Sequence, residues 1–519
     1  MTAPVTAAAL TRRALRGATA LRGGRAWRPT PFFVFGGLFW LVMTLAYWRV
    51  PMCCDFGQHA AVVERLRASL LHPRHPMADL PGAGSPYYSP YALSQGVLAR
   101  LTGLTGWEVV KLAGPANLLV LLTGLDRFVR ALTPRQWAPV LALLFMTVLW
   151  GTRTAWWSGY LGLLSMTGNL GYPSTCAIGL TFWAWGWALG LRRRAGRWWE
   201  YPAFGVLVAA ILLTHPITAV ATLIGTVCVL AGTGPSPSAA APRNAAGPLT
   251  GWTTAALACA AATLTWPYYS VTALVGNTSL DGIHRQLYTE MPAKFWLAFL
   301  GLPVLWARFR RAPRDPLVLM FALDALVVAY GWLSGHYTYG RILGLSLVPL
   351  QFSLAIALAA PRPWHRTRRT LGLAAAAGAL LGFLSVQAGA VVPRYFAQPP
   401  DWPAYTWAAQ HVPPGDVVLT DSYQATRSLP AYGPNLVAPA WPDPALDEAE
   451  RQRRLAAVRE YLSPRSTRPE RTALARRYGV HWLLLGKEQR LPAEAVVVAW
   501  SPRTGEVLAR VNGGSPRTR

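Results

Sequence analysis

Residues 31–59, PFFVFGGLFWLVMTLAYWRVPMCCDFGQH, decide how this chain is organised. The first part, 31–50, supplies the about 20 mostly apolar residues that a membrane-spanning helix needs. The second part begins with a proline and places Asp55 and His59 four residues apart. Arginines precede Pro31, so we expect the N-terminus in the cytoplasm and Asp55 at the outer surface, where the first span ends.

The composition indicates a membrane protein with many spans. With 519 residues and 53% hydrophobic content, the chain is too long for one small domain and too apolar for an ordinary soluble protein. The net charge of +27 does not indicate nucleic-acid binding, because the basic residues are nearly all arginines in short clusters between apolar runs, as the positive-inside rule predicts. These clusters are 12–28, 127–135, 192–197, 308–314 and 362–369.

The rest of the chain predicts a mainly α, polytopic membrane domain over 31–392, after a basic cytoplasmic arm at 1–30. Its first external loop, 51–106, is large, and apolar residues at helical spacing over 56–70 indicate an amphipathic helix on the membrane surface. Further spans follow, one of them broken at 214–216, Thr-His-Pro, which makes about 11 membrane segments. They are 107–125, 137–150, 173–191, 201–232, 251–268, 295–306, 316–334, 342–360 and 370–392.

The tail, 393–519, has a different composition and is expected outside the cell. Strand-like stretches interleave with helical ones, which predicts a small extracytoplasmic α/β domain. The expected strands are 417–419, 481–485, 495–500 and 506–511, and the expected helices are 402–411, 446–462 and 469–478.

Asp55 has two interpretations that do not exclude each other. With Gln58 three residues later it fits a capping box, in which the carboxylate satisfies the first amides of the surface helix. A carboxylate at the mouth of a membrane cavity is also placed to accept a proton from a sugar hydroxyl. His59 lies one turn later on the same face, where it would bind substrate phosphate or a metal, or have no role beyond a polar surface.

The arrangement of a short arm, one span, an acid at the start of a large external loop, further spans and an external α/β domain resembles the GT-C membrane glycosyltransferases. The resemblance implies transfer of a sugar from a polyprenyl-phosphate carrier to an extracytoplasmic glycan, lipid or protein hydroxyl. It implies that Asp55 is the general base and that displacement is single, with inversion. The Arg-, Ala-, Gly- and Pro-rich composition resembles that of a high-GC actinobacterium, which makes arabinofuranose or mannose a plausible donor sugar.

The sequence also departs from the family pattern. Many members have two adjacent acids where this chain has Asp55 and Phe56, and many have another acid in the second external loop, here 153–172, which contains no carboxylate. A divalent metal site is therefore doubtful, because hard cations need several oxygen ligands, and we assign no metal ligand and no cofactor.

Arg341 is the second candidate. It ends the run GHYTYGR at 335–341, on the outer side of the span 342–360. A guanidinium there would hold the carrier phosphate with two hydrogen bonds, or else would contact lipid phosphate at the interface. His336 and Tyr339 in the same run, and His215 in the broken span, are further candidates for substrate binding. His284 and Arg285 are a weaker alternative to Arg341.

A transporter or flippase for a lipid-linked or anionic solute is the alternative function. Asp324 stands alone in a predicted span, where it would act as a proton relay, or else be protonated or paired with a Ser, Tyr or Arg of a neighbouring helix. Charges at the membrane midplane and broken helices, such as the one at 214–216, are typical of transporters. The absence of an inverted repeat and the large external domain count against it. A non-catalytic scaffold would lack a cavity joining Asp55 to the lipid phase. We expect contacts with membrane lipid and none with nucleic acid.

Overall fold

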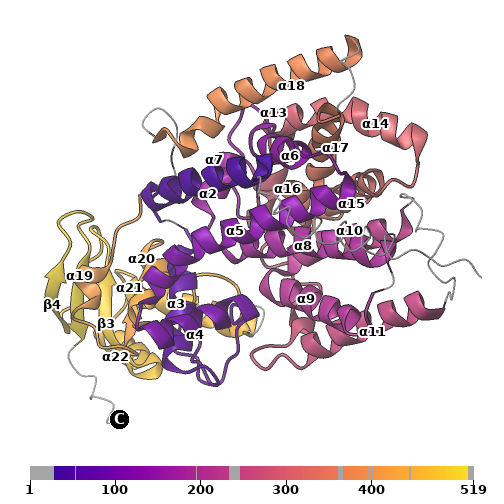
Figure 1. The fold of residues 1–519 in the computed structure, drawn as a ribbon. Helices are drawn as coiled ribbons and strands as arrows, with labels where there is room; N and C mark the ends of the chain where they lie inside the picture. The colour runs from indigo at the N-terminus through magenta and orange to yellow at the C-terminus, as the bar shows by residue number, and fades with distance from the viewer. Residues whose placement is uncertain are drawn as a thin grey trace, which may run out of the picture.

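The structure is a computed structural model that describes residues 29–52, 54–194, 196–232, 246–360, 366–393, 398, 401–443 and 446–511. The predicted basic arm lies outside these ranges except for Pro29 and Thr30. Helices dominate the described chain, and a small sheet lies near its C-terminal end (Figure 1).

Within the described ranges, four segments are long and apolar enough to cross a membrane. They are α2 (Pro31–Arg49), α5 (Gly106–Leu132), α15 (Pro316–Ser334) and the run Tyr337–Leu358, which contains η4 (Tyr337–Ile342), α16 (Leu343–Ser346) and α17 (Val348–Leu358). The expected number of about 11 membrane segments is not confirmed. Other helices of the bundle are α6 (Ala138–Val148), α8 (Pro173–Arg193), α9 (Glu200–Thr214), α10 (Pro216–Ala231), α11 (Ala246–Leu264), α14 (Leu302–Arg311) and α18 (Arg366–Ser385).

Helix α2 illustrates why the bundle belongs in lipid. Thr30 caps it by accepting a hydrogen bond from the backbone N–H of Phe33, and Pro31 occupies the first turn, where no N–H is needed. Large apolar side chains on its outer side remain exposed, including Phe33 at 60% and Leu38 at 57%. Such an apolar face is costly in water and suits the hydrocarbon core of a bilayer.

The break predicted at 214–216 is confirmed. Helix α9 ends at Thr214, α10 begins at Pro216, and His215 lies between them with φ −153° and ψ 87°. Proline cannot donate its backbone nitrogen to a helical hydrogen bond, so the chain leaves the helix here and starts a second one. The break leaves the imidazole of His215 free to make contacts outside either helix.

The C-terminal α/β region, residues 401–511, contains a five-stranded sheet of order β2-β1-β3-β5-β4. Strand β1 pairs in parallel with β2 and β3, whereas β5 pairs antiparallel with β3 and β4. Two further apolar clusters lie in this region, apart from the core of the bundle. Its elements are α19 (Thr406–Ala409), β1 (Val417–Leu419), α20 (Ala425–Ser428), η7 (Leu429–Tyr432), β2 (Asn435–Leu436), α21 (Glu448–Leu462), α22 (Arg468–Tyr478), β3 (Val480–Leu485), β4 (Ala495–Trp500) and β5 (Val507–Val511).

The four expected strands and the two longer expected helices of this region are present, to within two residues at each end, and three differences remain. The short helices α20 and η7 were not expected from the sequence. Strand β2 has only two residues, too few for a sequence pattern to indicate, and it is held by its parallel pairing with β1. The helix expected at 402–411 is shortened to α19.

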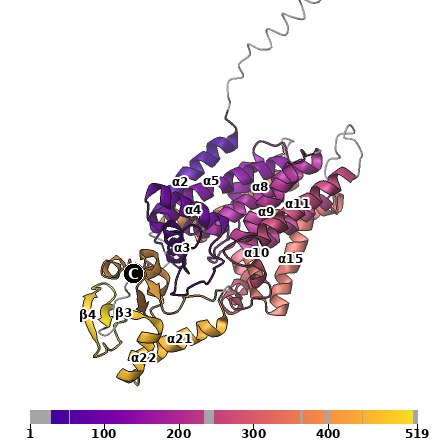
Figure 2. The same cartoon turned by 90° about the horizontal axis from the view of Figure 1, so that it is seen from below.

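Helix α3 (Phe56–Ala68) lies where the bundle meets the C-terminal region, and this differs from the expected surface helix. It packs against α4 (Pro90–Thr102) and α5 on one side and against α20 and η7 on the other. In both views the C-terminal sheet lies at one end of the helical bundle, beside α3 and α4 (Figures 1 and 2).

The prediction that this helix lies on the membrane surface is therefore wrong, because both of its sides are covered by protein. Arg65 is buried, and its guanidinium donates to the carbonyls of Gly433 and Pro434, each at 2.8 Å, and to Oδ1 of Asn435 at 2.7 Å. These acceptors compensate for the loss of water around the charge, which is why an arginine on this face is compatible with burial.

Candidate active site

Asp55 lies just before α3, in a turn that follows α2. The chain leaves α2 at Val50, and Cys54 takes a left-handed conformation with φ 62°. The carbonyl of Asp55 accepts hydrogen bonds from the N–H groups of Gln58 and His59, while its side chain makes no capping hydrogen bond. Oδ1 instead accepts a hydrogen bond of 2.9 Å from Nε1 of Trp441 in the C-terminal region. The capping-box interpretation is wrong, and the carboxylate faces tertiary partners.

A close approach between α3 and α20 holds this geometry. A Cβ atom added to Gly57 would lie 2.3 Å from the carbonyl oxygen of Arg427, closer than any real Cβ contact allows. Glycine is therefore required at this position for the backbones of the two helices to touch. The contact brings Arg427 beside the turn that contains Asp55.

Arg427 and Trp441 belong to the site although the sequence analysis did not predict them. The guanidinium of Arg427 lies over the rings of Tyr423 and Trp441, 3.8 Å and 4.1 Å from their centroids, and donates to the carbonyl of Tyr423 at 2.9 Å. Such stacking holds a planar cation in one orientation. Arg427 could have been found from its position shortly after β1, because polar segments that follow strands often form sites.

Arg341 lies in η4 and contacts two other parts of the bundle. Its Nη2 is 2.8 Å from Nε2 of His215 and donates to the hydroxyl of Ser158 at 3.3 Å. Arginine has no acceptor, so Nε2 of His215 accepts, and Nδ1 of this neutral imidazole donates to Thr218 at 2.7 Å. The Nε atom of Arg341 is buried and has no hydrogen-bond partner among the described residues.

Electrostatics connect the two arginines to Asp55. Burial raises the pKa of Asp55, whereas the hydrogen bond from Trp441 and the positive charges of Arg427 and then Arg341 lower it. Tyr87 lies within range of the same three charges; burial raises its pKa, and its hydroxyl donates to Oε1 of Gln58 at 3.4 Å. Asp55 and two guanidinium groups therefore belong to a single site between the bundle and the C-terminal region. A second carboxylate, Asp443, is also within electrostatic range of Tyr87, and it accepts a hydrogen bond of 2.7 Å from Ser85.

His59 lies in this site as a neutral imidazole. Its ring meets those of Tyr172 and Tyr87 edge to face, with centroids 5.1 Å and 5.9 Å away. Burial lowers the pKa of His59 to about 4, so the side chain is uncharged at neutral pH. It can therefore offer a hydrogen bond to a substrate but not a positive charge.

His336 and Tyr339 contact Asp281 and Tyr330 and not the residues around Asp55. Nδ1 of His336 is 3.3 Å from a carboxylate oxygen of Asp281, and the rings of His336 and Tyr339 both pack against Tyr330 of α15. His284 is also occupied, because its Nδ1 is 2.8 Å from the hydroxyl of Thr338. These residues position η4, which contains Arg341, and none of these contacts involves Asp55.

The described ranges contain no group of three or more histidine, cysteine or acidic side chains that could hold a metal ion. Asp324, the intramembrane acid, is 2% exposed in α15, and its Oδ1 has no hydrogen-bond partner among the residues described.

Comparison with solved structures identifies the architecture. The chain resembles the arabinofuranosyltransferase AftD from Mycobacteria, with 14% identity, a TM-score of 0.58 and coverage of 93% of this chain and 40% of that one. It also resembles the oligosaccharyltransferase AglB from Archaeoglobus fulgidus, in complex with an inhibitory peptide and a dolichol-phosphate, with 10% identity, a TM-score of 0.51 and coverage of 90% and 70%. A third is ArnT from Cupriavidus metallidurans bound to undecaprenyl phosphate, with 13% identity, a TM-score of 0.50 and coverage of 92% and 97%.

The chain has the GT-C glycosyltransferase fold. This confirms the resemblance that the arrangement of the sequence predicted. At these identities the likeness shows the fold and not the substrate. The chain spans about two fifths of the length of AftD. No protein-family model matches the sequence, and no curated protein matches it significantly.

Proposed function

We propose that this protein is a membrane glycosyltransferase that moves a sugar from a polyprenyl-phosphate carrier to an acceptor hydroxyl outside the cytoplasm. The fold supports this class, and two of the similar structures contain a polyprenyl-type phosphate, dolichol-phosphate in AglB and undecaprenyl phosphate in ArnT. The proposal puts the N-terminus in the cytoplasm and Asp55 with the C-terminal region on the outer face, because arginines precede α2.

The charge balance around Asp55 is the observation that carries the proposal. Arg341 and Arg427 flank one carboxylate, and neither forms an ion pair within 4.0 Å with an acidic side chain of the described chain. Asp443 also lies within electrostatic range of Tyr87, but its carboxylate contacts Ser85 and His75 and not the two arginines. Buried guanidinium groups that no carboxylate contacts directly favour a negatively charged ligand. The phosphate of a lipid carrier has this charge, and a guanidinium can bind its oxygens in pairs.

Buried polar atoms without partners support a ligand at the same place. They include Nε of Arg341 and the hydroxyl of Tyr160, which lies within electrostatic range of Arg341. Native proteins rarely leave such atoms unsatisfied, so each requires an explanation. A phosphate or sugar bound between Arg341 and Asp55 would provide the missing hydrogen bonds.

The proposed reaction is a single displacement. The acceptor hydroxyl gives its proton to the carboxylate of Asp55, and its oxygen forms a bond to the anomeric carbon of the sugar. The bond between that carbon and the phosphate oxygen breaks, and the lipid phosphate leaves with the electron pair. Arg341 stabilises the charge that grows on the phosphate. No second carboxylate at the site is assigned as a nucleophile, so inversion is expected.

Arabinofuranose and mannose remain the sugars that we propose for the donor, with a cell-envelope glycan, lipid or protein as the acceptor. The resemblance to a mycobacterial arabinofuranosyltransferase is consistent with the first, and the Arg-, Ala-, Gly- and Pro-rich composition with either.

The test is an assay of transfer from polyprenyl-phosphate-linked arabinofuranose or mannose by the purified full chain. We expect Asp55→Asn to lower turnover by about 1000-fold, because the amide cannot accept the proton, while donor binding persists. Asp421→Asn, which changes an exposed acid of the C-terminal region, is the matched control and should retain turnover. Full turnover by Asp55→Asn would remove Asp55 as the base, and no transfer from any such donor by the wild-type protein would contradict the function.

A further inference from the structure

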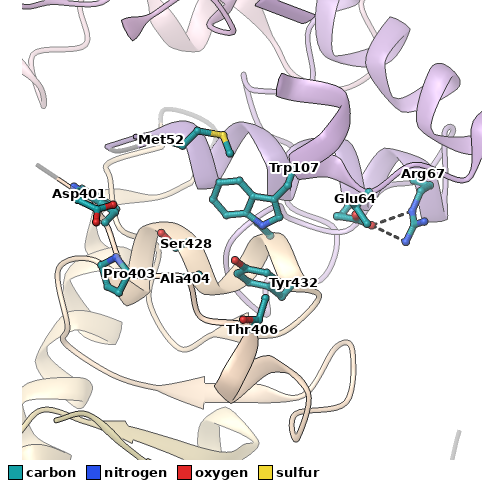
Figure 3. A pocket seen from close by; sticks show the side chains of 13 residues that line it. Met52, Glu64, Arg67, Trp107, Asp401, Pro403, Ala404, Thr406, Ser428 and Tyr432 are labelled. Atoms are coloured by element: carbon teal, nitrogen blue, oxygen red, sulfur yellow. Dashed lines mark hydrogen bonds and ion pairs between the residues drawn. The ribbon is translucent and has the colours of Figure 1, made fainter. Parts of the chain in front are cut away.

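A cavity lies between the bundle and the C-terminal region. Its volume is about 650 Å³, within the range of small-molecule sites. Met52, Glu64 and Trp107 line it from the bundle, and Asp401, Trp402 and Tyr432 line it from the C-terminal region (Figure 3).

Aromatic rings from both sides form part of its wall. The rings of Trp107 and Tyr432 form a tilted pair with centroids 5.6 Å apart and planes inclined by 41°, and Trp402 also lines the cavity. The face of an aromatic ring is electron-rich and attracts the polarised C–H groups on the flat side of a sugar ring. The indole Nε1 of Trp107 is buried and has no hydrogen-bond partner in the described chain, so it is a donor without an acceptor.

Charged groups complete the wall. Oε2 of Glu64 pairs with Arg67 at 3.0 Å, and Asp401, with 60% of its side chain exposed, pairs with Arg503. Carboxylates accept hydrogen bonds from sugar hydroxyls, and the guanidinium of Arg67 donates them. Ring faces next to such groups suit a saccharide. A bare hydrocarbon chain would not use the charges, and a free phosphate would meet two carboxylates.

Two residues that line the cavity are close in the chain to residues of the site around Asp55. Met52 precedes Asp55 by three residues, and Ser428, which also lines the cavity, follows Arg427. We propose that this cavity is a saccharide subsite that holds an acceptor glycan, so that a terminal hydroxyl of the glycan reaches Asp55. Its role in acceptor binding rests on the proposed function, whereas its ability to bind a saccharide does not. Among the acceptor classes considered above, this selects a glycan.

Direct binding tests the subsite without turnover. Short linear oligosaccharides of arabinose and of mannose are added to the detergent-solubilised full chain, and binding is measured by saturation-transfer NMR and tryptophan fluorescence. We expect the wild-type protein and Asp55→Asn to bind one of these probes equally. Trp107→Leu should weaken binding about 10-fold through the loss of the stacking surface. The matched control is Trp500→Leu, which changes a 63% exposed tryptophan on the edge strand β4, and it should bind as the wild type does.

A second variant keeps the proposal falsifiable if Trp107→Leu fails to fold. Asp401→Ala changes an exposed side chain and should also weaken binding. Binding unchanged in both cavity variants, or no binding of either oligosaccharide by the wild type, would overturn the subsite. In a transfer assay, a raised KM with an unchanged kcat for Asp401→Ala would support it, and an unchanged KM would overturn it. Saccharide binding without transfer would contradict the proposed function and leave the subsite standing.

Discussion

Arg341 and Arg427 approach Asp55 from two regions of the molecule and are held in different ways. Arg341 comes from the bundle, where its guanidinium contacts a neutral imidazole and a hydroxyl and leaves Nε unsatisfied. Arg427 comes from the C-terminal region, where its guanidinium lies over the rings of Tyr423 and Trp441 and donates to the carbonyl of Tyr423. Its Nε also has no hydrogen-bond partner among the described residues, so the two arginines differ in what holds them.

This difference indicates two roles for the arginines: binding of the donor phosphate, and control of the pKa of Asp55. Arg341 has donors left for a ligand, and its protein partners carry no charge, so an arriving phosphate would meet little competition. Arg427 is fixed by two rings, and its charge lowers the pKa of Asp55 more than that of Arg341 does. We infer that Arg341 binds the leaving phosphate and that Arg427 keeps Asp55 ionised. Four substitutions test these two roles, and they are given in order of decreasing expected effect.

Arg341→Gln should have the largest effect, because it removes a charged bidentate donor from the proposed phosphate. We expect donor affinity to fall about 100-fold, or about 2.7 kcal/mol, as measured by titration with a non-transferable polyprenyl phosphate. Arg285→Gln tests the weaker alternative from the sequence; Arg285 is exposed, so this variant should bind as the wild type does. Equal affinities for Arg341→Gln and the wild type would make Arg341 structural.

Arg65→Met tests whether the two regions are held together through α3. The substitution leaves the oxygens of Gly433, Pro434 and Asn435 without their charged donor and should cost about 2 kcal/mol of stability. Thermal unfolding of the solubilised protein measures the loss, and Arg67→Met, which changes a more exposed side chain of the same helix, is the control. If unfolding temperatures of the two variants coincide, the buried arginine does not connect the regions.

Arg427→Gln should move the pH profile more than donor binding. Asp55 acts as a base only when ionised, and its burial-raised pKa sets the acid limb above the ordinary aspartate value near 3.9. Loss of the Arg427 charge raises that pKa further, so the acid limb of kcat should shift to higher pH by about 1 unit. Arg427→Lys keeps the charge and should shift it less. If the acid limb of kcat in Arg427→Gln coincides with that of the wild type, Arg427 does not control the pKa of Asp55.

Asp324→Asn should have the smallest effect. This acid is buried in α15, outside the cluster of charges around Asp55, so we expect the transfer rate to remain within about 2-fold of the wild type. Reconstituted vesicles allow transfer and movement of the lipid-linked sugar to be measured together. Movement that fails in Asp324→Asn but survives in Asp55→Asn would favour the alternative of a transporter.

Much of the secondary structure could be predicted from local patterns. Helix α15 and strands β1 and β4 have the bounds that the sequence suggested, because each is an apolar run between residues that end regular structure. The break at His215 was visible for the same reason, since Pro216 acts on its own neighbours.

Only part of the candidate site could be predicted from the sequence. Asp55 and Arg341 could be nominated because each lies at the end of an apolar segment. Trp441 and Arg427 could not, because the hydrogen bond between Trp441 and Asp55 joins residues 386 positions apart in the chain. For the same reason the burial of Arg65 was missed, since its acceptors lie 368 positions or more away.

Local sequence patterns specify the apolar helices, the helix break and the small α/β region, because hydropathy, proline and strand alternation act over a few residues. Contacts between distant parts of the chain specify that the C-terminal region covers α3 and brings an indole and a guanidinium to Asp55, and these were visible only in the folded molecule. A charge is set by the groups that surround it in space, and the order of residues along the chain does not specify them.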